Sequence, residues 1–263
     1  MTVASRTEIT GARRIVVKVG SSSISGENAE KIQPIVEALA AAHGRGTEVV
    51  LVSSGAIATG MPFLALDERP SDLATQQAAA AVGQNVLIYR YQQALRPFEI
   101  VAGQVLLTAG DLEHATSRSN ARRAMDRLLG LRILPIVNEN DTVATHEIRF
   151  GDNDRLAALV AQLISADVVV LLSDIECLYT KPPTEPGAEP IRFVAHDDDL
   201  AGFEFGSVVV NSVGTGGAAT KVSAARLAAA SGIGVLVTSA DLVADALAGE
   251  SVGTWFAPAP AAR

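Results

Sequence analysis

Two lysines in this sequence stand where a phosphate could bind. Lys18 ends a β-branched run and is followed by Gly20 and the serines 21–23, so an ammonium group and accessible backbone amides occur together. Lys221 lies one turn into a predicted helix, after the glycine-rich segment 214–217. Glycines before a helix let a phosphate approach the free amides of its first turn. Taken alone, Lys18 also fits an edge-strand lysine that reaches solvent, and both interpretations stay open at this point.

Three further polar segments stand at the ends of predicted strands or helices. Ser53-Ser54-Gly55 follows a strand, where small residues would let a ligand reach the amides of a helix; a serine N-cap is the alternative. Asn138-Glu139-Asn140-Asp141 follows the run ILPIV, and four consecutive polar residues rarely serve packing. Gly151-Asp152-Asn153-Asp154 opens a helix, and N-capping with the helix dipole explains only one of these residues.

Several familiar motifs are missing. The sequence contains no G-x-x-x-x-G-K-[ST], no H-E-x-x-H, no G-x-S-x-G around Ser54 and no G-x-G-x-x-G after the first strand, and its four histidines have no ligand spacing. A Walker ATPase, a zinc hydrolase and a serine hydrolase are therefore disfavoured, and a dinucleotide oxidoreductase is weakened. Phosphoryl transfer depends mainly on positioning and charge stabilisation, so Lys18, Lys221 and an orienting carboxylate, Asp154, would suffice with a metal ion. These residues favour an α/β enzyme that binds phosphate groups and transfers a phosphoryl group.

The elements that must position these residues alternate between strand and helix. Continuous apolar runs predict strands at 14–19, 48–52, 104–107, 133–137, 168–172 and 235–238, the last as the final central strand. Helical patterns cover 28–42, 71–95, 119–129, 154–164 and 220–230. Such alternation predicts a parallel sheet covered on both faces, with ligands beyond the carboxyl ends of its strands. The proline-rich stretch 181–191 predicts a surface hairpin or flap.

Composition sets outer limits on function. The 263 residues fit one large α/β domain or two small ones. The net charge of −8 (21 − 29) makes nucleic acid and anionic membranes poor partners. Residues 1–14 have no apolar core of a signal peptide, no apolar run has bilayer length, and a single cysteine, Cys177, can neither staple the chain nor bind zinc alone. We expect a cytoplasmic protein.

Seven motifs in this order resemble the glutamate 5-kinases of the amino acid kinase family. They are VVKVGSS, VSSGAIATG, AAVGQ, VNENDTVAT, FGDNDRLAALVA, LLSDIECLYT and GTGGAATK, and the resemblance runs from about Arg14 to Phe256. VNEND followed by GDND separates this group from acetylglutamate kinase, aspartokinase and uridylate kinase. The resemblance implies a three-layer α/β/α sandwich with a mainly parallel sheet. It also implies ATP-dependent phosphorylation of the L-glutamate side-chain carboxylate to L-glutamyl 5-phosphate, the first step of proline synthesis.

The resemblance also assigns roles to residues. Lys18 and Lys221 resemble the lysines that stabilise the transferring phosphoryl group, and Asp154 the carboxylate that organises them. The residues that resemble glutamate ligands are Ser54, Asp141 and Asn153. The nucleotide contacts are implied at Lys18, Ser173, Asp174, Thr215, Gly216, Gly217, Ala218 and Lys221. Magnesium would bridge the ATP phosphates, with no metal site made by the protein alone.

The implied organisation is one kinase domain over residues 1–257, whose N-terminal part binds the amino acid and whose C-terminal part binds ATP. Residues 258–263 are expected to form a disordered tail. Two features depart from the family pattern: Ala218 replaces a usual methionine in the nucleotide loop, and the C-terminal PUA domain of many members does not follow Arg263.

The resemblance further implies proline as a feedback inhibitor, a homo-oligomer, and functional coupling to glutamyl phosphate reductase. Two alternatives remain open. One is a related kinase that acts on N-acetylglutamate, aspartate, carbamate or a phosphorylated small molecule. The other is a non-catalytic small-molecule sensor on the same fold, against which the joint presence of Lys18, Asp154 and Lys221 counts.

Overall fold

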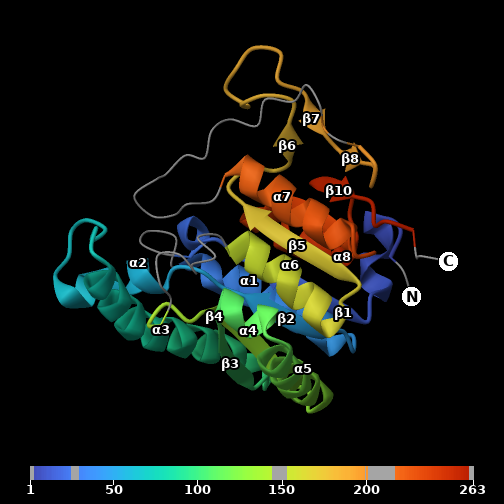
Figure 1. The fold of residues 1–263 in the computed structure, drawn as a ribbon. Coiled ribbons are helices and arrows are strands. Elements are labelled where there is room, and N and C mark those ends of the chain that lie inside the picture. The colour runs from blue at the N-terminus through green and yellow to red at the C-terminus, as the bar shows by residue number, and fades with distance from the viewer. Residues whose placement is uncertain (1–2, 25–29, 144–152, 199, 201–216, 261–263) are drawn as a thin grey trace.

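An eight-stranded sheet forms the centre of the protein (Figure 1). The computed structural model describes residues 3–24, 30–143, 153–198, 200 and 217–260. The strand order is β3-β4-β2-β1-β5-β9-β10-β8. The strands are β1 (Arg14–Lys18), β2 (Glu48–Val52), β3 (Ala102–Leu107), β4 (Leu134–Glu139), β5 (Val168–Ser173), β8 (Phe193–Val194), β9 (Gly234–Ser239) and β10 (Thr254–Phe256).

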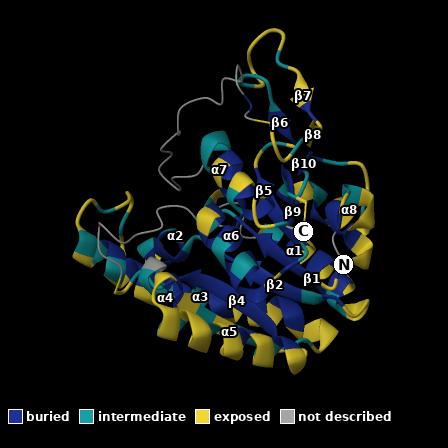
Figure 2. Ribbon diagram, turned by 45° about the vertical axis from the view of Figure 1, so that its right-hand side comes forward, coloured by how far each residue is buried: buried dark blue, intermediate teal, exposed yellow. Residues whose placement is uncertain are grey.

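Helices cover both faces of this sheet, as the alternation of strands and helices predicts. The helices are α1 (Ile32–Gly44), α2 (Ala56–Gly60), α3 (Leu73–Leu95), α4 (Ala109–Glu113), α5 (Ala115–Gly130), α6 (Asn153–Ile164), α7 (Ala218–Ala229) and α8 (Val243–Ala248). Ile15 and Val17 join a core with α1, α3 and α8, whereas Val16 joins a second core with α5, α6 and α7. Successive side chains of a strand point to opposite faces, so both faces are apolar and both are buried (Figure 2). The three-layer sandwich is confirmed.

The sequence predictions differ from the structure in several places, among them the following. α1 begins at Ile32, after residues 30 and 31 of the predicted helix; residues 28 and 29 of that prediction lie outside the described part of the chain. β4 extends past the predicted end at 137, because Asn138 and Glu139 pair with Leu106 and Leu107 of the edge strand β3. The prediction that the strand at 235–238 is the last is wrong: β10 follows and runs antiparallel to β9.

The proline-rich hairpin is confirmed. β6 (Leu178–Tyr179) pairs antiparallel with β7 (Pro190–Ile191), and the hairpin stands apart from the central sheet at the top of Figure 1. In the expected tail, the Ala259 amide donates to Ala229 O, and residues 261–263 lie outside the described part of the chain. Among the described residues no helix has both the length and the apolarity to cross a bilayer.

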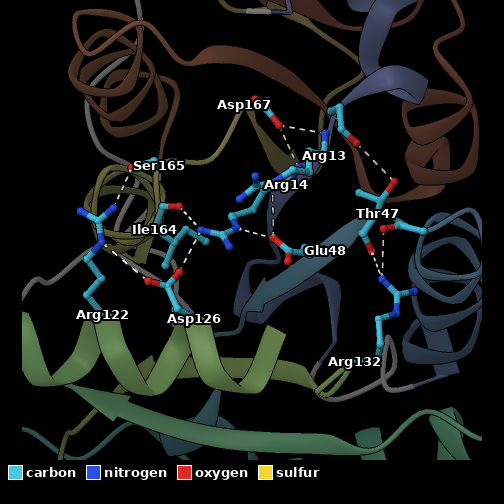
Figure 3. Close-up of polar contacts among 12 residues, drawn as sticks. Arg13, Arg14, Thr47, Glu48, Arg122, Asp126, Arg132, Ile164, Ser165 and Asp167 are labelled. Atoms are coloured by element: carbon cyan, nitrogen blue, oxygen red, sulfur yellow. Dashed lines mark hydrogen bonds and ion pairs between the residues drawn. The ribbon is translucent and has the colours of Figure 1, made fainter. Parts of the chain in front are cut away.

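A buried arginine joins four elements at the amino end of β1 (Figure 3). Arg14 is 6% exposed. Its guanidinium donates to Glu48 Oε2 in β2 at 2.7 Å, to Asp126 Oδ1 in α5 at 3.1 Å, and to Ile164 O at the end of α6. The Arg14 backbone amide donates to Asp167 Oδ2 at 2.8 Å. This cluster lies at the opposite end of β1 from Lys18, so we assign it to stability.

We therefore expect Arg14→Met to lower the free energy of unfolding by roughly 1.5–3 kcal/mol, because it removes hydrogen bonds to charged groups from a buried position. Arg13→Met is the matched control, since the Arg13 side chain is 76% exposed and lies 3.9 Å from Glu48; we expect it to change stability by about 0.5 kcal/mol or less. Urea unfolding of both variants measures the difference. Equal losses of unfolding free energy in the two variants would show that the buried hydrogen bonds of Arg14 add no stability beyond that of the exposed Arg13 side chain.

Candidate active site

The carboxyl ends of the parallel strands gather the candidate residues at one edge of the sheet. Lys18 ends β1, and Ser53 and Ser54 follow β2, its neighbour. Asn138 is near the end of β4, which pairs with β2. Ser173 ends β5, on the other side of β1. The structure thus brings to one edge segments that are far apart in the sequence, as expected for a ligand site in a parallel sheet.

Asp154 holds both lysines through its two oxygens. Lys18 Nζ lies 2.6 Å from Asp154 Oδ1, and Lys221 Nζ lies 3.0 Å from Asp154 Oδ2. Asp154 is fully buried in the first turn of α6, and the lysines are 4% and 6% exposed. The catalytic trio predicted from the sequence therefore forms one contiguous cluster, in which one carboxylate fixes two ammonium groups.

The start of α7 supplies a further contact to this cluster. Gly217 caps the helix, and its amide donates to Thr220 Oγ1 at 3.1 Å. The Thr220 hydroxyl can donate to Gly217 O at 2.9 Å or to Asp154 Oδ2 at 3.2 Å. Thr220 is a site residue that the sequence prediction missed as an individual contact. Its position one residue before Lys221, at the third position of a helix, was the available signal.

The charge balance of the cluster fixes the state of its carboxyl group. Burial alone raises the pKa of Asp154, but the ammonium groups of Lys18 and Lys221 outweigh it, so the pKa lies below the ordinary value. Asp154 is therefore ionised at neutral pH. Because both of its oxygens are engaged by ammonium groups, it is suited to holding the lysines rather than to accepting a proton from a substrate.

The amide group of Asn153 ties together the ends of two strands. Its Nδ2 lies 2.8 Å from Ser53 O, 2.9 Å from Ser54 Oγ and 3.0 Å from Asn138 Oδ1. Ser53 O is a carbonyl oxygen that can only accept, so the amide nitrogen must face it. Two N–H groups are thus shared among three protein acceptors. Without breaking these bonds, the side chain can offer a ligand only its carbonyl oxygen, which is an acceptor.

A second layer of polar side chains supports these strand ends. Asn138 is 2% exposed, and its Nδ2 donates to Gln84 Oε1 of α3 at 2.7 Å. Tyr91, also on α3, is fully buried and shares a 3.0 Å hydrogen bond with Ser53 Oγ. No role was assigned to Gln84 or Tyr91 from the sequence. The signal for Gln84 was its place at the end of the quoted motif AAVGQ.

The remaining predicted site residues lie as follows. Asp141 is partly exposed in the turn after β4, Ser173 is buried at the end of β5, and Asp174 is exposed directly after it. Gly217 and Ala218 begin α7. Thr215 and Gly216 lie outside the described residues. Ser54 and Asn153 are in contact, and Asp154 is in contact with both Lys18 and Lys221.

The described residues contain no group of three His, Cys, Asp or Glu side chains able to hold a metal ion. Asp154 is engaged by two lysines and is a poor metal ligand in this arrangement. The protein's own contribution is fixed positive charge from Lys18 and Lys221.

Comparison with known proteins by sequence gives one family. The model of the amino acid kinase family matches residues 13–239. A glutamate 5-kinase of Leifsonia xyli subsp. xyli is 72% identical over 98% of this chain and 96% of its own length. The corresponding protein of Clavibacter sepedonicus is 71% identical over 98% and 99%. A longer glutamate 5-kinase of Salinispora arenicola is 54% identical over 97% of this chain and 70% of its own length.

Solved structures share the fold at low sequence identity. The carbamate kinase from Giardia lamblia bound to AMP-PNP has a TM-score of 0.69 at 16% identity and covers 95% of this chain and 100% of its own. The T. acidophilum isopentenyl phosphate kinase product complex has a TM-score of 0.63 at 16% identity and covers 92% and 99%. The family match over residues 13–239 and the relatives at 70–72% identity show that the chain belongs to the amino acid kinase family.

Proposed function

We propose that this protein transfers the γ-phosphoryl group of ATP to the side-chain carboxylate of L-glutamate and forms L-glutamyl 5-phosphate, the first step of proline synthesis. The relatives at 70–72% identity are named glutamate 5-kinase, and they match 98% of this chain. The observation that carries the chemistry is the pair of buried lysines held by Asp154.

The site has the parts that a carboxylate acceptor needs. An oxygen of the glutamate side chain attacks the γ-phosphorus, the bond from that phosphorus to the bridging oxygen breaks, and ADP leaves with the electron pair. The attacking carboxylate is already ionised at neutral pH and has no proton to lose. A general base is therefore unnecessary, in agreement with an Asp154 whose two oxygens are both engaged by lysines. Lys18 and Lys221 supply charge that stabilises the phosphoryl oxygens during transfer.

We propose that the two substrates bind on opposite sides of β1. Glutamate is placed beside β2 and β4, against Ser54, Asp141 and Asn153. The Ser54 hydroxyl can donate to a carboxylate, whereas the Asn153 oxygen, as an acceptor, fits an ammonium group better. The nucleotide is placed beside β5 and the start of α7, against Ser173, Asp174 and the segment 215–221, where Mg²⁺ bound with ATP would neutralise phosphate charge.

The proposed activity can be tested by trapping the acyl phosphate with hydroxylamine. The purified protein is incubated with Mg-ATP, hydroxylamine and one acceptor: glutamate, N-acetylglutamate, aspartate or carbamate. We expect hydroxamate and ADP to form together with glutamate. ADP formation with another acceptor would support a related kinase instead, and glutamate binding without ADP formation would support the sensor alternative.

We expect proline to inhibit by competition with glutamate. Proline shares the α-carboxylate and α-nitrogen that the acceptor pocket must bind. The apparent KM for glutamate should rise with proline concentration while kcat stays constant, as measured by initial rates over a matrix of the two amino acids. Inhibition that does not weaken as glutamate rises would remove the shared site from the proposal.

We further propose that the protein acts in the cytoplasm as a homo-oligomer. Its product, an acyl phosphate, hydrolyses readily in water, so coupling to a glutamyl phosphate reductase would protect it. Sedimentation of the pure protein tests the homo-oligomer, and a coupled assay with that reductase tests the coupling.

A further inference from the structure

A buried glutamine on α3 lies behind the proposed acceptor site. Gln84 is 9% exposed and lies in an alanine-rich helix with an apolar inner face. A polar side chain in such a place is stabilised only if it is hydrogen-bonded. Its Oε1 accepts from Asn138 Nδ2 at 2.7 Å, a contact between side chains on different elements of the fold.

The directions of the hydrogen bonds follow from one fixed end. Asn153 must turn its nitrogen toward Ser53 O, a carbonyl, so Asn138 must present its oxygen to that nitrogen. Asn138 Oδ1 also accepts from the backbone amide of Glu139 at 2.9 Å. The Asn138 nitrogen therefore faces Gln84, which must present its oxygen. The side-chain amides of Asn153, Asn138 and Gln84 thus form a hydrogen-bonded series, in which the orientation of each amide fixes that of the next.

Close packing holds α3 in place relative to the same region. A Cβ atom on Gly83 would lie 1.8 Å from Ala56 O, and one on Gly60 would lie 1.9 Å from Ala79 O. α2 and α3 thus meet backbone to backbone at the residue before Gln84, and α2 begins directly after Gly55. Gln84 is consequently held at a fixed distance from the loop that carries Ser54.

Loss of the acceptor on Gln84 would leave the Asn138 nitrogen unpaired in a buried position. Rotation of the Asn138 amide would restore no bond, because its nitrogen would then face two donors, the Glu139 amide and Asn153 Nδ2. In either case the support for Asn153 weakens. The ion pairs from Lys18 and Lys221 to Asp154 involve none of these three amides. Binding of the ATP phosphates should therefore be less affected than binding of the acceptor.

We propose that Gln84 is a positioning residue for the acceptor pocket: it acts through Asn138 to orient Asn153 beside Ser54. This inference rests on the proposed function, because it takes glutamate to bind at Ser54 and Asn153. It adds a residue of α3, outside the strand ends, that determines acceptor affinity without touching the substrate.

The test compares Gln84→Met, Gln84→Glu and Gln76→Met in the hydroxylamine assay. Gln84→Met keeps a side chain of similar length but removes the acceptor, and we expect the KM for glutamate to rise about fivefold to fiftyfold, with the KM for ATP within about twofold of the wild type. Gln84→Glu keeps an acceptor oxygen toward Asn138, so its KM for glutamate should lie nearer the wild-type value. Gln76, on the same helix, is 8% exposed and donates to Pro70 O, which makes Gln76→Met the control for loss of a buried amide.

Thermal melts of all three variants separate stability from positioning. We expect Gln84→Met and Gln76→Met to lower Tm similarly and only Gln84→Met to raise the KM for glutamate. The inference is overturned if Gln84→Met leaves that KM unchanged, if it raises both KM values equally, or if Gln84→Glu is impaired as much as Gln84→Met. If the wild type itself forms no hydroxamate with glutamate, the proposed function fails, which is a different outcome from any of these.

Discussion

Replacing Lys18 or Lys221 by alanine should lower kcat about a hundredfold to a thousandfold, the usual effect of removing one donor that stabilises charge in a transition state. Negative charge shifts among the phosphoryl oxygens as the bond to ADP breaks, and an ammonium fixed by Asp154 stabilises that redistribution more than the ground state. The KM for glutamate should change little, because neither lysine is placed among the acceptor ligands.

Initial rates over glutamate and ATP concentrations measure this split between kcat and KM. Lys31→Ala is the matched control: Lys31 pairs with Asp241 at 3.1 Å, and its side chain is 41% exposed, so kcat should stay at the wild-type level. A Lys18→Ala variant with near-normal kcat and a raised KM for ATP would make Lys18 a ground-state phosphate clamp and would contradict the mechanism.

Asp154→Asn should reduce both stability and activity. The amide cannot neutralise two buried ammonium groups, and removal of one member of a buried ion pair typically lowers the free energy of unfolding by about 3–5 kcal/mol. Lysines that lose their common anchor are no longer fixed for the phosphoryl group, so kcat should fall at least as far as in the single lysine variants.

The pH dependence of stability gives a second signature of Asp154. Burial opposes its ionisation, but the two lysines lower its folded-state pKa below the unfolded value of about 4. The stability that it contributes is therefore fully present above about pH 4 and is lost as the pH falls toward the lowered pKa. Asp154→Asn should remove this part of the acid dependence.

Urea unfolding at neutral pH and in the acid range measures both effects. Asp126→Asn is the control, since Asp126 also pairs with a buried cation, Arg14, but is 42% exposed. Its loss should lower the free energy of unfolding by only about 1 kcal/mol, because water can replace part of the interaction. Equal losses of unfolding free energy in the two variants would show that the buried Asp154 contributes no more to stability than the partly exposed Asp126.

The main strands of the fold and the family could be predicted from the sequence. Apolar runs at β1, β2, β5 and β9 predicted a parallel sheet, because strands buried on both faces need continuous hydrophobic residues. Strand ends and helix starts then placed Lys18 and Asp154 at one edge of that sheet. The motifs also carried enough residue identity to indicate the family, which local patterns of polarity alone would not have done.

Some predictions failed where polarity misled. The strand was predicted to end at 137 because Asn138 and Glu139 are polar. Both are instead buried in β4, where pairing with β3 and the hydrogen bond from Asn138 to Gln84 satisfy polar groups. β10 was missed because a three-residue strand is too short to show a period.

Contacts between side chains that are far apart in the sequence could be identified only from the tertiary structure. Asp154 and Lys221 are separated by 67 positions. The resemblance implied that Asp154 organises both lysines, but the division of its two oxygens between them is visible only in the structure. Helical periodicity indicates that Gln84 faces inward, but it does not indicate which strand end lies opposite. Contacts of this kind depend on how β1, β4, α3, α6 and α7 pack together, and packing is a property of the whole chain rather than of any segment.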